Sequence, residues 1–261
     1  MNLGLQGKRA LVTGASKGIG LAVARRLLAE DVLVVDGSRE SSEELNALSK
    51  DSGVVHFDVD LSGSEGPARL VEAALSGGPI DILVNNAGAV TPRLGGFLSV
   101  TDEQWAKTIA LSFMAAVRTT RAVLPHMIDR RGGSIVNNAS VNASLPDPLV
   151  IDYSAAKGAL ANFTKALSKE VGSHGIRVNA VSPGPVSTAL WLGQQGVAAS
   201  VSAAQGIDPD DVADQAVKDT ATGRFTTPEE VADLIVFLAS TRVSNVTGAN
   251  YLIDGGLTQS L

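Results

Sequence analysis

The sequence predicts an α/β fold, a single Rossmann-like domain in which helices cover both faces of a doubly wound, mostly parallel sheet. Short runs rich in Val, Ile and Leu alternate along the chain with longer amphipathic segments, which is the pattern of successive βαβ units. Several of the short runs are continuously apolar, as expected for strands that are buried on both sides. No linker, repeat or low-complexity tract interrupts residues 1–261, so we expect one domain.

The predicted elements follow one another in regular order. Apolar runs predict strands at residues 10–12, 32–35, 82–84, 134–137, 178–181 and 251–253. Amphipathic spacing predicts helices at residues 21–29, 105–127 and 155–171. Residues 190–224 are rich in Ala, Gln and Asp and carry no strand pattern. This segment is expected to be either a lid over the substrate site or a set of surface helices without functional motion.

The composition excludes several classes of function. The absence of Cys excludes a disulfide framework, a Cys-ligated zinc site and thiol catalysis, and the scattered His56, His126 and His174 give no reason to expect a metal. A net charge of −6 argues against a nucleic-acid partner, although it allows a local basic pocket for a phosphate. Without an apolar run of membrane-spanning length or an N-terminal signal segment, the expected location is the cytoplasm.

A glycine-rich turn connects the first predicted strand to a helix. It reads Thr13-Gly14-Ala15-Ser16-Lys17-Gly18-Ile19-Gly20. Glycines at such a turn let the backbone approach a pyrophosphate, which the free N–H groups of the helix N-terminus then bind. A tight turn alone would also explain the glycines. The prediction of a phosphate-binding loop therefore depends on the strand before the turn and the helix after it. The residues expected to contact a dinucleotide here are Gly14, Ser16, Lys17, Gly18 and Ile19.

Tyr153 and Lys157 are four residues apart, which places them on one face of the predicted helix. A nearby ammonium lowers the pKa of a phenol from about 10, so the pair can exchange a proton with an alkoxide or an alcohol. Ser140 follows a strand at the edge of the sheet where ligands bind, and its hydroxyl can stabilise charge on a substrate oxygen. The alternatives are that Tyr153 and Lys157 share a helix face by chance, and that Ser140 is an ordinary turn residue.

Together these motifs resemble the short-chain dehydrogenase/reductase family, and in particular its 3-oxoacyl carrier-protein reductases and related ketoreductases. Residues 13–20 resemble its cofactor loop, residues 152–160 resemble its active-site helix, and Asn85-Asn86-Ala87-Gly88 is a family mark beside the nicotinamide ribose. The resemblance covers nearly the whole chain. It implies that Tyr153 is the acid/base, that Lys157 lowers the pKa of Tyr153 and holds the ribose, and that Ser140 orients the carbonyl oxygen.

The resemblance also implies further contacts with the cofactor. Asp58-Val59 resembles the pair that contacts adenine, although Asp58 could equally be an ordinary cap or turn residue. Pro183, Gly184, Val186 and Thr188 resemble the segment that contacts the nicotinamide carboxamide.

One position departs from the family pattern. Ser112 stands where the family commonly has an Asn that holds a water in a proton relay. The relay is therefore expected either to run through Ser112 or to be partly lost.

The end of the second strand decides between NADP and NAD. The family's NAD-selecting acid aligns with Ser38, next to Arg39, and Lys17 adds a second positive charge, so NADP is favoured. Asp36 favours NAD if the strand ends earlier than predicted.

The expected reaction is reversible hydride transfer between NADP(H) and a carbonyl/alcohol pair, mainly as a reduction. An NAD-linked alcohol or sugar dehydrogenase and a cofactor-binding protein without turnover are the alternatives. The substrate is a small molecule, and its pocket is expected to involve Asn142, Pro146, Ile151 and Trp191. Family members usually form tetramers, so we expect a homotetramer that packs through the helices at 105–127 and 155–171, with the final strand near a second interface.

Overall fold

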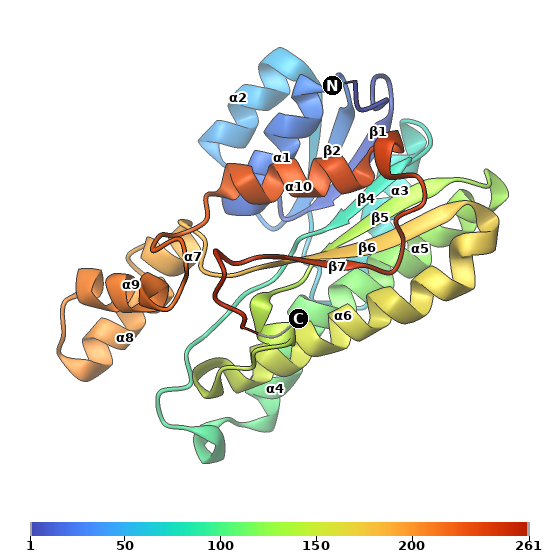
Figure 1. The fold of residues 1–261 in the computed structure, drawn as a ribbon. Helices are drawn as coiled ribbons and strands as arrows, with labels where there is room; N and C mark the ends of the chain where they lie inside the picture. The colour runs from blue at the N-terminus through green and yellow to red at the C-terminus, as the bar shows by residue number, and fades with distance from the viewer. Residues whose placement is uncertain (1, 260–261) are drawn as a thin grey trace.

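Seven parallel strands form one sheet in the order β3-β2-β1-β4-β5-β6-β7 (Figure 1). The computed structural model describes the backbone of residues 2–259 and the side chains of all of these except 50–52. The strands are β1 (Arg9–Thr13), β2 (Leu33–Ser38), β3 (Val54–Asp58), β4 (Ile82–Asn85), β5 (Gly133–Asn138), β6 (Ile176–Pro183) and β7 (Asn250–Ile253). The strand order reverses between β1 and β4, and this switch point is where α/β sheets bind ligands.

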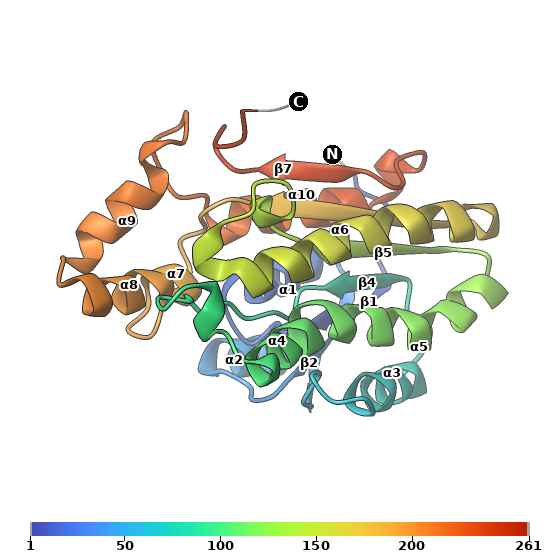
Figure 2. The ribbon, with the colours of Figure 1, turned by 90° about the horizontal axis from the view of Figure 1, so that it is seen from below.

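Helices cover both faces of the sheet (Figure 2). One face carries α1 (Gly18–Ala29), α2 (Glu43–Ser52) and α10 (Pro228–Ala239). The other carries α3 (Gly66–Ser76), α4 (Asp102–Ile109), α5 (Ala115–Asp129) and α6 (Ile151–Val171). The helices α7 (Ala189–Leu192), α8 (Val197–Gln205) and α9 (Pro209–Lys218) lie to one side, beyond the sheet (Figures 1 and 2).

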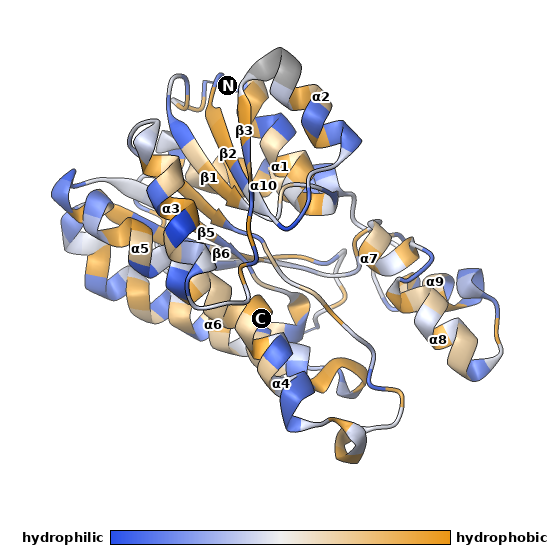
Figure 3. Cartoon of the chain, turned by 180° about the vertical axis from the view of Figure 1, so that it is seen from behind, coloured by the Kyte–Doolittle hydropathy of each residue, from blue (hydrophilic) through white to orange (hydrophobic). Residues whose placement is uncertain are grey.

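Two hydrophobic cores lie on the two faces of the sheet. Because side chains alternate along a strand, Val34 joins the core beneath α1 and α10, and Val35 joins the core beneath α3 and α5. Figure 3 shows the consequence as apolar strands enclosed by helices of mixed polarity. This arrangement confirms the predicted Rossmann-like α/β fold with a doubly wound parallel sheet.

Several boundaries differ from the prediction. The strand predicted at 32–35 continues to Ser38, because parallel pairing with β1 and β3 continues there. The helix predicted at 105–127 is divided by a π-helical segment, Ala110–Met114. Residues 190–224 contain helices and no strand, as expected. Within the described part of the chain, no helix is both long and apolar enough to cross a membrane.

Candidate active site

A cavity of about 1380 Å³ opens at the carboxyl edge of the sheet, around the switch point between β1 and β4. Segments that follow all seven strands line it. Ligand pockets commonly have volumes of about 300–1,000 Å³, so this cavity has room for an extended ligand and a second small molecule. Segments that are distant in the sequence therefore meet at one site.

The turn after β1 is shaped as a phosphate cradle. Gly14 has a φ of +74°, a conformation that glycine adopts without strain. At Gly20, a Cβ atom would collide with the carbonyl oxygen of Gly14, so the first turn of α1 packs closely on the loop. The Asn86 Nδ2 donates to the carbonyl oxygens of Thr13 at 3.1 Å and Gly14 at 3.0 Å, which fixes the loop to the end of β4.

The start of α1 is open to a ligand. No side chain caps the helix at Lys17, and its first turn carries no acidic residue, so its N–H groups and positive dipole end face the cavity without an internal anion. The predicted phosphate-loop residues all line the cavity, namely Gly14, Ser16, Lys17, Gly18 and Ile19. The residues present therefore fit the pyrophosphate of a dinucleotide.

Ser38 and Arg39 also line the cavity, at the end of β2. Asp36 does not, because its side chain is fully buried beneath the loop. The Asp36 Oδ1 accepts a hydrogen bond from the backbone N–H of Ala15 at 2.7 Å, and Oδ2 accepts one from Ser38 Oγ at 2.7 Å. Since β2 does not end before Ser38 and the Asp36 side chain is fully buried, Asp36 does not face the cavity.

After β3 the structure departs from one expectation. Asp58 does not line the cavity, because its carboxylate points to the side chain of His56, whereas Val59 does line it. Asp60 and Leu61, which sequence reasoning missed, form the wall instead. The signal was present in the sequence, because the Asp–apolar pair occurs twice in succession there.

The predicted catalytic residues Ser140, Tyr153 and Lys157 meet on the opposite wall of the cavity. The helix α6 begins at Ile151, so Tyr153 lies in its first turn and Lys157 one turn later, with Lys157 Nζ 5.5 Å from the centre of the phenol ring. The same Nζ donates to the Asn138 carbonyl oxygen at 2.6 Å. This bond fixes the lysine to the end of β5.

Burial determines the protonation of this pair. It raises the pKa of Tyr153 to about 12, and hydrogen bonding with Ser140 offsets only part of this effect. It lowers the pKa of Lys157 to about 8. Desolvation of the phenolate therefore outweighs the lowering of the phenol pKa that was expected from Lys157. At neutral pH the phenol is protonated, the form that a proton donor requires, and Lys157 is mainly a cation.

Ser112 lies behind the site and not in its wall. It is buried in the π-helical segment, and its Oγ donates to the Ala89 carbonyl oxygen at 3.2 Å and accepts from the Ala89 N–H at 3.4 Å. A Cβ atom on Gly88 would be 3.7 Å from Ser112 Oγ and 3.6 Å from Lys157 Nζ, so both side chains approach Gly88. The hydroxyl thus fastens the loop after β4 close to Lys157.

The other predicted residues divide between the wall and the interior. Asn86, Ala87, Gly88, Pro183, Gly184, Val186 and Thr188 all line the cavity. Of the predicted substrate contacts, Asn142, Pro146 and Trp191 line it, and Ile151 does not. Trp191 packs edge-on against Phe225 with ring centres 5.8 Å apart. Among the side chains that the structure describes, no group of three or more His, Asp or Glu is arranged to hold a metal ion.

A buried ion pair, not noticed in the sequence, supports the catalytic helix. Arg93 pairs with Asp152, the residue before Tyr153, and Thr108 Oγ1 donates to the same carboxylate at 2.7 Å. Burial alone would raise the pKa of Asp152, but the hydrogen bonds from Arg93 and Thr108 outweigh it and hold this pKa below its ordinary value. The pair fastens the segment after β4 to the start of α6.

The chain is similar to known oxidoreductases. The family model described as "Enoyl-(Acyl carrier protein) reductase" matches residues 14–258. The oxidoreductase YvrD of Bacillus subtilis is 36% identical over 100% of both chains. The 3-oxoacyl-[acyl-carrier-protein] reductase FabG of Thermotoga maritima is 35% identical over 97% of this chain and 98% of its own.

A solved structure is similar over the whole chain. L-Sorbose reductase from Gluconobacter frateurii, complexed with NADPH and L-sorbose, has a TM-score of 0.92 and 35% identity, with 100% of both chains covered. The family match, the relatives and the assembled Ser140, Tyr153 and Lys157 agree. This chain therefore belongs to the short-chain dehydrogenase/reductase family and is an NAD(P)-dependent oxidoreductase.

Proposed function

We propose that this enzyme reduces a small-molecule ketone to a secondary alcohol with NADPH. The observation that carries the choice of cofactor is the enclosure of Asp36, both of whose carboxylate oxygens already accept hydrogen bonds inside the protein. An NAD-specific site needs a free carboxylate for the ribose 2′-hydroxyl. Here the cavity offers Ser38 and Arg39 instead, and a guanidinium is suited to a 2′-phosphate.

We further propose that the remaining cofactor contacts follow the course of the cavity. The phosphate loop would hold the pyrophosphate, and Val59, Asp60 and Leu61 would face the adenine. The nicotinamide ribose would lie against Asn86, Ala87, Gly88, Tyr153 and Lys157, with Pro183, Gly184, Val186 and Thr188 next to the nicotinamide. The bound nicotinamide supplies the hydride to the carbonyl carbon.

Tyr153 is the proton donor in this mechanism. Its phenol is protonated at neutral pH because burial raises its pKa to about 12, and it faces the cavity beside Ser140. As the hydride arrives at the carbonyl carbon, the phenol O–H donates its proton to the oxygen, and the phenolate that remains is stabilised by the Lys157 cation. Ser140 donates a hydrogen bond to the same oxygen and so fixes the orientation of the carbonyl.

Ser112 has a positioning role in this proposal. Because its hydroxyl is bonded to the backbone of Ala89, it holds the loop after β4 and is not available as the principal carrier of a proton. A proton could return to Tyr153 from the solvent that enters the open cavity, so a relay through Ser112 is not required for turnover.

The segment α7–α9 would act as a lid on the substrate side. It contributes Trp191, Val197 and Ala216 to the cavity wall, although it lies beyond the sheet (Figures 1 and 2). The NADPH-bound neighbour is named as a reductase of the ketose L-sorbose, and the Thermotoga maritima relative is named for 3-oxoacyl reduction. We therefore propose ketoses and 3-oxo esters as the first substrate classes for this cavity, whose wall combines Asn142 with Leu145 and Trp191.

The test compares the turnover of NADPH and NADH with a panel containing L-sorbose, other ketoses and 3-oxoacyl thioesters. Wild-type enzyme should use NADPH with at least one ketone and should bind NADPH more tightly than NADH. Arg39→Ala should weaken NADPH binding by roughly 10–100-fold, as expected for loss of a charged hydrogen bond, and should leave NADH binding nearly unchanged. Arg25→Ala, at an exposed position of α1 outside the cavity wall, is the matched control. Equal losses for both cofactors would contradict the proposal.

A further inference from the structure

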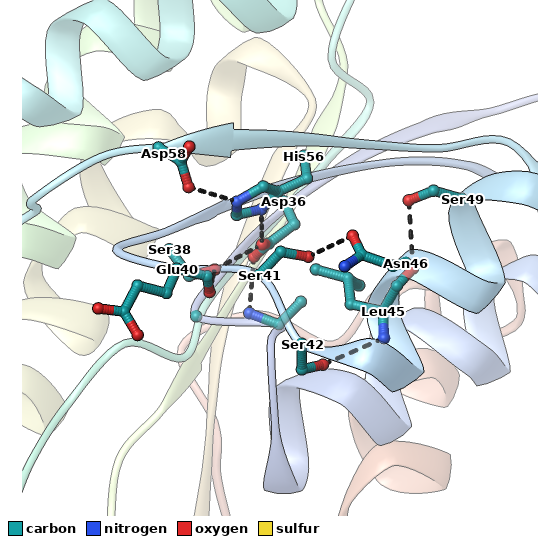
Figure 4. Close-up of polar contacts among 12 residues, drawn as sticks. Asp36, Ser38, Glu40, Ser41, Ser42, Leu45, Asn46, Ser49, His56 and Asp58 are labelled. Carbon is teal, nitrogen blue, oxygen red and sulfur yellow. Dashed lines mark hydrogen bonds and ion pairs between the residues drawn. The ribbon is translucent and has the colours of Figure 1, made fainter.

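Four polar side chains lie together on one face of β2 and β3, next to the predicted 2′-phosphate site (Figure 4). The parallel register pairs Asp36 with His56 and Ser38 with Asp58. Because side chains on a strand alternate between the two faces, all four project to the same side. The mechanism of hydride transfer uses none of the three ionisable groups Asp36, His56 and Asp58.

His56 lies between two carboxylates. Its Nδ1 is 2.7 Å from Asp36 Oδ2, and its Nε2 is 2.9 Å from Asp58 Oδ1. The exposures of the two carboxylates differ greatly, since the Asp36 side chain is fully buried and the Asp58 side chain is 78% exposed. His56 itself is mostly buried, with 15% of its side chain exposed.

This geometry favours the imidazolium form of His56. An ionised carboxylate only accepts hydrogen bonds, and a neutral imidazole has a single N–H, so only the cation donates to both carboxylates. Burial lowers the pKa of His56, but the hydrogen bonds and charges of Asp58 and Asp36 outweigh this effect and raise the pKa above 6.5. His56 therefore remains a cation to a higher pH than a free histidine.

The charge of His56 acts on the wall of the cavity through Asp36. The same Asp36 Oδ2 that meets His56 also accepts from Ser38 Oγ, and Oδ1 accepts from the Ala15 N–H in the phosphate loop. Together Asp36, His56 and Asp58 carry a net charge of −1 with the imidazolium and −2 without it. A buried carboxylate directly behind Ser38 and Arg39 would repel a phosphate dianion unless a cation compensates it.

We propose that His56 is a specificity-determining, positioning residue, which as an imidazolium neutralises Asp36 behind Ser38 and Arg39 and so permits binding of the 2′-phosphate of NADP(H). This inference rests on the proposed preference for NADP(H). It makes the preference for the 2′-phosphate depend on pH. The protein prefers a ligand with the 2′-phosphate most strongly while His56 is protonated. This preference falls as the pH rises through the raised pKa of His56.

Other charged groups near this cluster do not replace His56. The charged side chains described on the adjoining segments are Lys17 in the phosphate loop, Arg39 and Glu40 after β2, Asp60 after β3, and Glu43 and Glu44 in the first turn of α2. Four of these six are acidic, and both cations, Lys17 and Arg39, line the cavity. Loss of the charge on His56 therefore leaves two cations against the buried Asp36 and these four carboxylates.

The test measures the adenosine end by itself, without turnover. Calorimetry gives the dissociation constants of adenosine 2′,5′-bisphosphate and of 5′-AMP, and their ratio isolates the contribution of the 2′-phosphate. The range from pH 6.8 to pH 9 lies above the second pKa of a phosphate monoester, about 6, so the ligand itself remains a dianion. The variants are His56→Gln, which removes the cation, and Asp58→Asn, which removes one of the two groups that raise the pKa of His56.

For wild-type protein, the preference for the 2′-phosphate should decrease by about tenfold across this range, as expected for one uncompensated charge at a partly exposed site. His56→Gln should have the low preference at every pH. Asp58→Asn should keep the preference at low pH but lose it at a lower pH than wild type. If His56 acted only in folding, the pH at which half of the preference is lost would be the same for Asp58→Asn and for wild type.

Two results would overturn the inference in distinguishable ways. If His56→Gln retains the wild-type preference and its pH course, the inference is wrong and the proposed NADP(H) preference stands. If wild-type protein binds both ligands equally at every pH, the NADP(H) preference is wrong and the inference falls with it. If His56→Gln does not fold, Asp58→Asn provides the test, through the pH at which half of its preference for the 2′-phosphate is lost. This variant is expected to fold because the Asp58 side chain is exposed.

Discussion

Replacing Asp152 with Asn should destabilise the enzyme strongly, although the side chains have nearly the same shape. The Asp152 side chain is 1% exposed and that of its partner Arg93 is 9% exposed, so the substitution leaves a buried guanidinium without its counter-charge. Breaking a buried pair in this way costs about 3–5 kcal/mol. Thr108 also loses its ionised acceptor, because its Oγ1 donates to the same carboxylate.

Chemical denaturation of wild type and Asp152→Asn at pH 7 measures this loss of unfolding free energy. The matched control is Asp233→Asn, which breaks the exposed pair between Arg26 and Asp233, with side chains 47% and 57% exposed, and should cost about 0–1 kcal/mol. A third variant, Arg93→Leu with Asp152→Leu, removes both charges and should recover much of the loss.

The pH dependence gives a second check on the same pair. The pKa of Asp152 is lower in the folded state than in the unfolded chain, so its contribution to stability is present above about pH 4 and lost as the pH falls through the folded pKa. Asp152→Asn should therefore reduce the loss of stability in acid. The reasoning would be refuted if Asp152→Asn and Asp233→Asn had equal effects on stability.

Two further predictions concern the site, and a third concerns the oligomeric state. Tyr153→Phe keeps the shape but removes the transferable proton, so ketone reduction should fall by about 10²–10⁴-fold while fluorescence titration shows unchanged NADPH binding; parent activity on every substrate would contradict its role as acid. With a pKa of about 8, Lys157 is a cation below this value, so kcat for reduction should fall as the pH rises through about 8, and a flat profile from pH 7 to pH 9 would exclude a need for the cation. Light scattering should give a mass near four times the 26.8 kDa of one chain, whereas the mass of a single chain would disprove the tetramer.

The fold could be predicted from the sequence, and candidate site residues could be named, because their signals are local. The alternation of apolar runs with amphipathic segments predicted the parallel sheet, since strands buried on both sides must be apolar throughout. The Tyr153 and Lys157 pair was recognisable because four residues make about one helical turn. The glycine-rich turn was recognisable because it lies between a strand and a helix.

Properties that depend on which groups face one another could not be predicted in this way. The pKa of Tyr153 was expected to be lowered by Lys157, but burial raises it to about 12, and burial is a property of the assembled cavity. Ser112 was expected at the site, yet its hydroxyl bonds to Ala89, because a π-helical segment turns it toward the loop after β4. Asp58 was expected to face adenine, yet it faces His56.

By itself, the sequence predicted the alternation of strands and helices, the glycine-rich turn and the Tyr153 and Lys157 pair, because each shows as a pattern among neighbouring residues. Only the tertiary structure decided how Asp36 is used. Residues 15, 36 and 56 are far apart in the sequence, and the parallel register of β2 with β3 brings His56 beside Asp36 while the turn after β1 brings the Ala15 N–H onto the same carboxylate. Asp36 is fully buried and does not line the cavity, and no local pattern in the sequence reveals that burial.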